Sequence, residues 1–103
     1  MRRVEVGDIV RILSAPETVA AGYADRTGTC YGFTTPSMSE ADVIGPAVED
    51  DALSIHFDDG SSAWFARSLV AFVDVGSGQI MRIGKKWFVR TPGGDWIESL
   101  GPN

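Results

Sequence analysis

Residues 52–66 read ALSIHFDDGSSAWFA, and this stretch decides the fold. Its ends, residues 52–57 and 63–66, are short runs rich in apolar and aromatic side chains, and polar residues separate them. The segment Asp58-Asp59-Gly60-Ser61 predicts a tight turn, with Gly60 in the left-handed backbone conformation. The stretch therefore predicts two antiparallel strands joined by a turn.

Similar short runs and turn residues continue from this hairpin toward both ends of the chain. In the first three quarters we expect strands at residues 8–13, 27–34, 52–57, 63–66 and 70–74. Further strands are expected at residues 79–83, 86–90 and 95–98. Residues 67–69 predict a tight turn, and residues 37–43 hold the one candidate helix. Residues 14–26 and 35–50 are expected to be loops. This pattern is typical of an all-β protein.

A short joint, Gly76-Ser77-Gly78, divides the predicted strands into two groups. Residues 1–75 hold five strands, and residues 76–103 hold a three-stranded β-meander with turns at 84–85 and 91–94. Because a three-stranded sheet of this size is marginally stable by itself, we expect the meander to pack on the first segment or on a partner.

Four motifs carry a resemblance to a known fold. They read GDIVRI at 7–12, RTGTC at 26–30, IHFDDG at 55–60 and FARSLV at 65–70. Together they resemble the motifs of bacterial SH3-like β-barrels, and the resemblance covers residues 6–75. It implies a five-stranded SH3-like barrel followed by the meander.

Three groups with such barrels suggest different functions. They are the PsaE subunit of photosystem I, the β-subunit of nitrile hydratases, and the plasmid-borne type II dihydrofolate reductases. The reductase segment that binds folate and nicotinamide is matched here by residues 62–65, where Ala63 and Phe65 replace its Gln and Tyr. The chain has no cysteine cluster for hydratase metal chemistry, and its acidic balance departs from the ferredoxin-docking surface of PsaE. The resemblance thus implies a fold more than a function.

Charge is distributed unevenly along the chain. Up to Val75 there are five basic and twelve acidic residues, which gives −7, and from Gly76 there are four basic and two acidic residues, which gives +2. The acidic part argues against nucleic acid as a partner, because phosphate binding depends on Lys and Arg. The basic residues Arg82, Lys85, Lys86 and Arg90 are expected to form a solvated sheet edge.

The composition also indicates a compartment. Cys30 is the single cysteine, so an internal disulfide is impossible and a reducing environment is favoured. The N-terminus has no apolar signal region, and no apolar run is long enough to cross a membrane. These features predict a cytoplasmic protein without membrane contact, and the resemblance implies a bacterial source.

Candidate catalytic residues have simpler interpretations. His56, the single histidine, alternates with inward-facing residues and should face outward, and Cys30 should lie in the core. The pairs Asp50-Asp51 and Asp58-Asp59 occupy loop positions, where Asp stabilises turns. We therefore predict no catalytic residue, no metal and no cofactor.

Aromatic residues are the more informative surface signal. Strand alternation should direct Tyr31, Phe33, His56 and Trp64 to one outer face. Tyr23 and Trp64 should border a groove between the first long loop and the fourth strand. In the meander, Met81, Ile83 and Phe88 should share one face and Ile80, Trp87 and Val89 the other. A sheet that is apolar on both faces is usually covered on both.

The sequence thus predicts a protein-interaction or assembly module that forms homo-oligomers or binds a protein partner. Its expected contact residues are Tyr23, Tyr31, Phe33, His56, Trp64 and Trp87. The alternative is a subunit of an enzyme complex, or a pore-forming oligomeric enzyme similar to the type II reductases. A third hypothesis is nucleic-acid binding through the basic hairpin.

Overall fold

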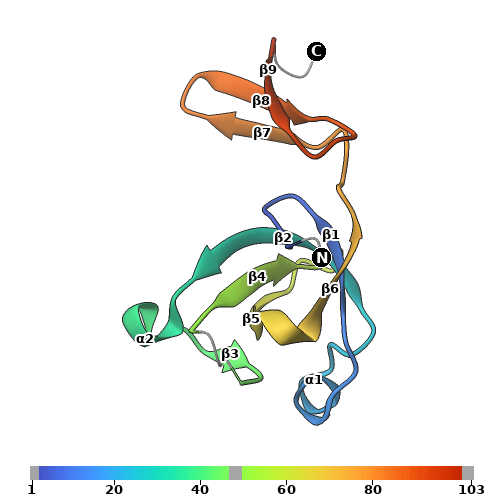
Figure 1. The fold of residues 1–103 in the computed structure, drawn as a ribbon, viewed down its shortest axis with the longest axis vertical. Coiled ribbons are helices and arrows are strands. Elements are labelled where there is room, and N and C mark those ends of the chain that lie inside the picture. Colours follow the sequence, from blue (N-terminus) through green and yellow to red (C-terminus); the bar gives the residue numbers. More distant parts are fainter. Residues whose placement is uncertain (1–2, 47–49, 101–103) are drawn as a thin grey trace.

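The computed structural model describes residues 3–46 and 50–100, which contain nine strands in two separate sheets (Figure 1). Residues 1–2 and 101–103, at the ends of the two predicted segments, and residues 47–49, in the predicted second loop, lie outside the described residues. The all-β class predicted from the sequence is confirmed.

The first sheet has six strands in the order β3-β5-β4-β2-β1-β6. The strands are β1 (Ile9–Ile12), β2 (Thr27–Thr34), β3 (Val43–Ile44), β4 (Ala52–His56), β5 (Ser62–Ala66) and β6 (Val70–Asp74). β3 pairs with β5 in parallel, and every other pair is antiparallel. Within the described residues no ladder joins the outermost strands β3 and β6, so the sheet is not closed into a barrel.

Three short helical segments connect these strands, namely α1 (Pro16–Ala21), α2 (Pro36–Ser39) and the 3₁₀ turn η1 (Arg67–Leu69). The prediction of a loop at 14–26 was wrong, because this segment contains α1. Pro16 occupies the start of α1, and Gly22 ends it in the left-handed conformation, with φ of 83°. The helix predicted at 37–43 is shorter and begins earlier, since Glu40 already takes a left-handed conformation and ends it.

The core lies on one face of the six-stranded sheet. Its buried side chains are Val4, Val10, Ile12, Cys30, Leu53, Ile55, Phe57, Phe65 and Val70. Leu53 and Ile55 of β4 and Phe65 of β5 face this core, as the pattern of residues 52–66 predicts. The predicted placement of Cys30 in the core is confirmed, because none of its surface is exposed.

The second sheet has three strands in the order β7-β8-β9. They are β7 (Ile80–Ile83), β8 (Lys86–Arg90) and β9 (Trp96–Ser99). Met81 lies opposite Phe88, and Ile80 lies opposite Val89, which in turn lies opposite Ile97. The two faces predicted for the hairpin are therefore confirmed.

A β-bulge starts the second sheet. The Gly78 amide donates to the Arg90 carbonyl at 2.8 Å, and the Arg90 amide donates to the Gln79 carbonyl at 2.9 Å. Gly78 and Gln79 thus face one residue of β8, and Gly78 has a φ of 87°, which glycine adopts without strain. The bulge fixes the direction in which β7 leaves the joint.

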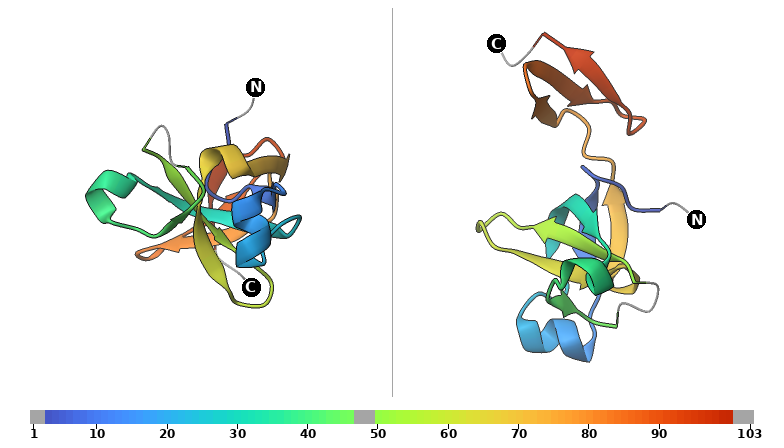
Figure 2. Two further views of the ribbon diagram at one scale, coloured as in Figure 1. Left: turned by 90° about the horizontal axis from the view of Figure 1, so that it is seen from below. Right: turned by 90° about the vertical axis from the view of Figure 1, so that its left-hand side faces the viewer.

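The three-stranded sheet lies beyond one end of the six-stranded sheet (Figures 1 and 2). The described chain is elongated, with extents of 44 × 29 × 28 Å. Among the described residues no helix is long and apolar enough to cross a membrane. The two sheets meet near the start of β1, and the meeting point contains the cleft described next.

Candidate functional site at the junction of the two sheets

A buried ion pair joins the two sheets. Arg90, at the end of β8, places Nη2 2.9 Å from Oδ1 of Asp8, and both side chains are almost completely buried. Arg90 Nη1 donates to the Val6 carbonyl at 2.9 Å, and Nε donates to the Gly94 carbonyl at 3.0 Å. The expectation that Arg90 belongs to a solvated edge was wrong. Its guanidinium is buried because carboxylate and carbonyl oxygens replace its hydration.

Gly7 makes this contact possible. It has a φ of 94°, and a Cβ at this position would lie 2.5 Å from Arg90 Nη1 and 2.8 Å from the Trp96 ring. A side chain would therefore force the two sheets apart. The Arg90 guanidinium lies 5.6 Å from the centroid of the Trp96 ring, which packs beside it.

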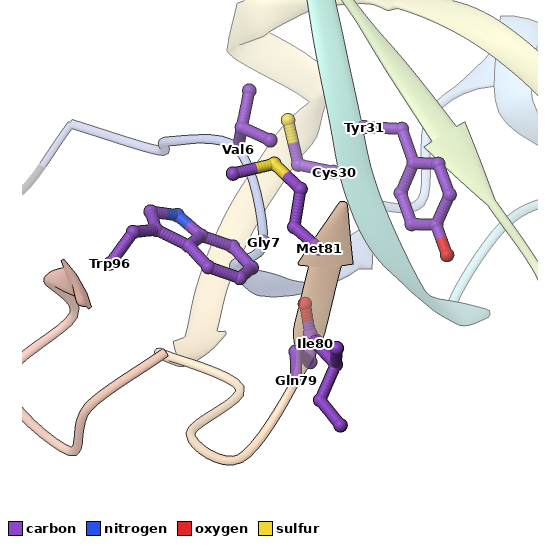
Figure 3. A pocket seen from close by; sticks show the side chains of 8 residues that line it. All are labelled: Val6, Gly7, Cys30, Tyr31, Gln79, Ile80, Met81 and Trp96. Carbon is purple, nitrogen blue, oxygen red and sulfur yellow. The ribbon is translucent and has the colours of Figure 1, made fainter. Parts of the chain in front are cut away.

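A cleft of about 190 Å³ lies beside the ion pair. Its lining residues come from the N-terminal segment, β2, β7 and β9, and are Val6, Gly7, Cys30, Tyr31, Gln79, Ile80, Met81 and Trp96 (Figure 3). Most of these are apolar, sulfur-containing or aromatic. Such a lining suits an apolar group, and the few polar atoms suit its orientation.

Cys30 lines the inner end of the cleft, and its thiol is unreactive. Its thiol lies 3.8 Å from the Gly32 carbonyl oxygen, to which it donates. Burial raises the pKa of the Cys30 thiol to about 11. Because the thiolate is the nucleophile, a thiol with this pKa suits packing and not catalysis near neutral pH.

Tyr31 borders the cleft, and its ring lies on the other side of β2 from Met81 (Figure 3). Its side chain is 60% exposed, and its ring stacks on His56 with the centroids 4.1 Å apart. His56 is exposed, as its position on β4 predicts. The pair thus continues the surface of the cleft onto the outer face of β2 and β4.

Phe33 does not share that face. A bulge between Cys30 and Gly32 interrupts the alternation of β2, so Phe33 lies opposite the core residue Leu53. The Arg67 guanidinium lies 5.3 Å from the Phe33 ring centroid, in a second cleft of about 300 Å³ that also includes Asp51. The outer aromatic face predicted from strict alternation is therefore divided, because the bulge adds one residue.

Tyr23 and Trp64 lie on opposite faces of β5. The Tyr23 ring packs 5.0 Å from Phe57 and 5.4 Å from Phe65, on the core side. The Trp64 side chain lies on the opposite face of β5 from that of its buried neighbour Phe65. In the sheet, Trp64 pairs with Ser54 of β4 and with Val43 of β3. The two rings do not share a groove.

Trp87 lies on the face of the three-stranded sheet away from Met81. Its ring is half-buried under Arg82, whose guanidinium lies 5.4 Å from the centroid. Ile80 and Ile97 lie on the same face, and each exposes about half of its surface, 52% and 51%. Trp87 therefore belongs to a second apolar surface, outside the cleft.

The paired aspartates stabilise loops, as predicted. Asp59 accepts from the Ser61 amide at 2.9 Å and lies 3.0 Å from Arg26 Nη2. The Ser61 hydrogen bonds lower the pKa of Asp59 to about 2, and Arg26 contributes further. The Ser37 hydroxyl and amide likewise lower the pKa of Asp50. In residues 3–46 and 50–100 no three His, Cys, Asp or Glu side chains gather as metal ligands would.

The sequence predicted only Tyr31 among the residues that line the cleft. Met81 and Trp96 were overlooked as site residues because the cleft arises between two sheets, and their relative position is not encoded in strand alternation. One signal was present: Asp8 and Arg90 each occur beside apolar strand residues, where a charge needs a partner.

Comparisons with protein-family models, curated proteins and solved structures gave no match. The function is therefore argued from the residues of this chain.

Proposed function

We propose that the chain is a protein-interaction module that binds its partner at the junction cleft. The observation that carries the proposal is the composition of this cleft, in which Val6, Met81 and Trp96 surround an apolar space between two sheets and the largely exposed Tyr31 lies at its border. Apolar surface that is concave and open to solvent is typical of binding sites. Aromatic residues and Met are enriched in protein interfaces.

The cleft does not act as a flexible gap between independent parts. Arg90 joins the three-stranded sheet to the N-terminal segment through the Asp8 carboxylate and the Val6 carbonyl, and Gly7 permits the close approach. The walls are therefore held in place before a partner arrives. A preorganised site loses less conformational entropy on binding, which favours affinity.

We also propose that the six-stranded sheet is an SH3-like barrel. The order β6-β1-β2-β4-β5, with the 3₁₀ turn η1 between β5 and β6, supports this proposal. The short β3 is an addition at the edge. In this arrangement the loop-rich N-terminal segment and β2 present their side chains toward the second sheet.

Site-specific photo-crosslinking in the producing cell tests the interaction. A photoreactive phenylalanine analogue replaces Tyr31 in one variant and Val19 in another; both native side chains are 60% exposed, and Val19 lies on α1, outside the cleft. We expect one defined protein adduct from position 31, formed with another protein or with a second copy, and none from position 19. The same adducts at both positions, or none at position 31, would contradict the proposal.

A further inference from the structure

We propose that the junction cleft binds an extended acidic peptide segment, which adds as a strand to the free edge of β7 and inserts an apolar side chain beside Met81. This inference rests on the proposed function and names the class of partner. It follows from the hydrogen-bond pattern of β7, from the position of the cleft beside β7, and from the charges at the end of the β7–β8 hairpin.

β7 presents unused backbone groups on one side. It is an outermost strand, and β8 is its partner strand in the described residues. The hydrogen bond from the Arg90 amide to the Gln79 carbonyl sets the pattern of the ladder. Bonded and non-bonded pairs alternate in an antiparallel ladder, so Met81 and Ile83 bond to β8. The amides and carbonyls of Ile80 and Arg82 then point away from β8.

The cleft lies against the face of the three-stranded sheet that carries Met81 and Trp96, and it reaches β7 at Ile80. Met81 and Ile80 both line it, although their side chains lie on opposite faces of the sheet. Figure 3 shows the Met81 side chain directed toward Cys30 and the Ile80 side chain directed away. Ile80 therefore borders the cleft with its backbone. An added strand would meet hydrogen-bonding groups and an apolar pocket together, as in known modes of peptide recognition by strand addition.

Charge at the hairpin tip selects the partner. Arg82, Lys85 and Lys86 are exposed near the turn that ends β7. Arg82 follows Met81 directly, Lys86 pairs with Ile83, and Lys85 lies in the turn beyond, so these cations lie one to three residues along the edge from Met81. An acidic residue of the peptide two or three positions from its apolar anchor would lie beside them. We therefore infer an apolar anchor and an acidic residue at that spacing.

The same cations argue against a second copy as the occupant. In antiparallel pairing of two β7 edges about a two-fold axis, the hairpin tip of each copy would lie beside residues 78–80 of the other copy, which include no Asp or Glu. Lys85 and Lys86 would therefore meet no opposite charge. The edge is thus protected against itself and open to an acidic segment of different sequence.

Selection from a displayed library of random 12-residue peptides, against the full chain, tests the proposal. We expect enriched peptides with an aromatic or large aliphatic residue and an Asp or Glu two or three positions away. A synthetic peptide of the enriched sequence is then measured by fluorescence anisotropy. Met81→Ala should weaken its binding about tenfold. Ile83→Ala, on the same strand and face but outside the cleft, should change binding less than twofold.

A backbone N-methyl scan of the same peptide separates this proposal from the proposed function. Strand addition predicts that methylation of every second amide abolishes binding, because only alternate amides bond to β7. Binding that depends on Met81 but tolerates methylation at every position would overturn strand addition and leave the interaction module intact. Enrichment of basic peptides, of no peptide, or an affinity indifferent to Met81 would also overturn this inference. So would a dimer in sedimentation that Arg82→Glu strengthens.

Discussion

The two sheets of this protein are held together by opposite means. The six-stranded sheet encloses a dry core in which Phe65, Leu53 and Ile55 expose none of their surface. In the three-stranded sheet the single fully buried side chain among the described residues is Arg90, and its partners belong largely to the other sheet. One unit is stabilised by burial of apolar surface, whereas the other depends on polar contacts that specify a position.

This difference indicates a division of labour. The six-stranded sheet supplies most of the folding free energy, because it buries most of the apolar side chains. The three-stranded sheet contributes little core of its own, and Ile80, Ile83 and Ile97 remain about half or more exposed. The role of this sheet is to place Met81 and Trp96 opposite the surface of β2, where they line the cleft.

The largest expected effect comes from the core of the six-stranded sheet. Phe65→Ala removes a fully buried ring that contacts Tyr23 and Phe57, and we expect it to lower the free energy of unfolding by about 3–5 kcal/mol. Urea unfolding followed by circular dichroism measures this loss. Phe88→Ala, at a half-buried position of the other sheet, serves as the comparison. Equal losses for both variants would break the contrast between the two sheets.

Arg90→Ala should undo the junction and spare the six-stranded sheet. It leaves the Asp8 carboxylate without its arginine partner, and loss of one member of a buried pair typically costs about 3 kcal/mol or more. Hydrogen-exchange mass spectrometry should show faster exchange in β7–β9 and little change in β2 and β4. Arg82→Ala removes an exposed arginine of the same sheet and should change stability by less than about 0.5 kcal/mol. Unchanged protection of β7–β9 in Arg90→Ala would show that another contact holds this sheet.

The smallest effect concerns pH at the boundary between the sheets. Burial raises the pKa of Cys30 to about 11, so between its usual value of 9.0 and about 11 the unfolded chain releases a proton that the folded chain retains. The contribution of Cys30 to the free energy of unfolding is complete below pH 9 and decreases as the pH rises from 9 to about 11. We expect a loss of about 1 kcal/mol between pH 8 and pH 10. In urea unfolding of Cys30→Val, the free energy of unfolding should not show this loss between pH 8 and pH 10. An equal loss in the variant and the native protein would show that Cys30 is not its cause.

Much of the fold could be predicted from the sequence where local rules suffice. The strands at 27–34, 70–74 and 86–90 have the predicted bounds, because alternating apolar residues and adjacent turn residues specify them locally. The hairpin turn at Gly60 was predicted for the same reason. These features require no knowledge of distant residues.

The errors in the predicted fold arose where the structure depends on residues distant in sequence or on a single inserted residue. β3 consists of two residues and exists through parallel pairing with β5, which lies about twenty residues later. The β2 bulge at Tyr31 reverses the side of Phe33, and the adjacent Gly32 was the local signal for it that strict alternation ignored. Helix α1 was missed although Pro16 and Gly22 are ordinary start and stop signals, because six residues give no measurable periodicity.

The candidate site was harder to predict than the fold. Strand alternation identified Tyr31 and His56 as outward-facing, and their stacking confirms that they are neighbours. It did not identify the cleft, because Arg90 defines the relative position of the sheets through oxygens of Asp8 and Val6, more than eighty residues earlier. From the sequence alone, a buried arginine in a basic segment cannot be distinguished from a solvent-exposed arginine, because its acidic partner lies far away in the chain.

The joint Gly76-Ser77-Gly78 makes the three-stranded sheet a tethered ligand of the six-stranded sheet. A short covalent tether maintains an effective concentration on the order of millimolar at its target. An intrinsic affinity too weak to join two separate proteins therefore suffices to keep Arg90 on Asp8. A protein that competed for Asp8 would have to bind it more tightly than Arg90 does at this local concentration. A peptide bound at the β7 edge would leave the contact between Arg90 and Asp8 unchanged.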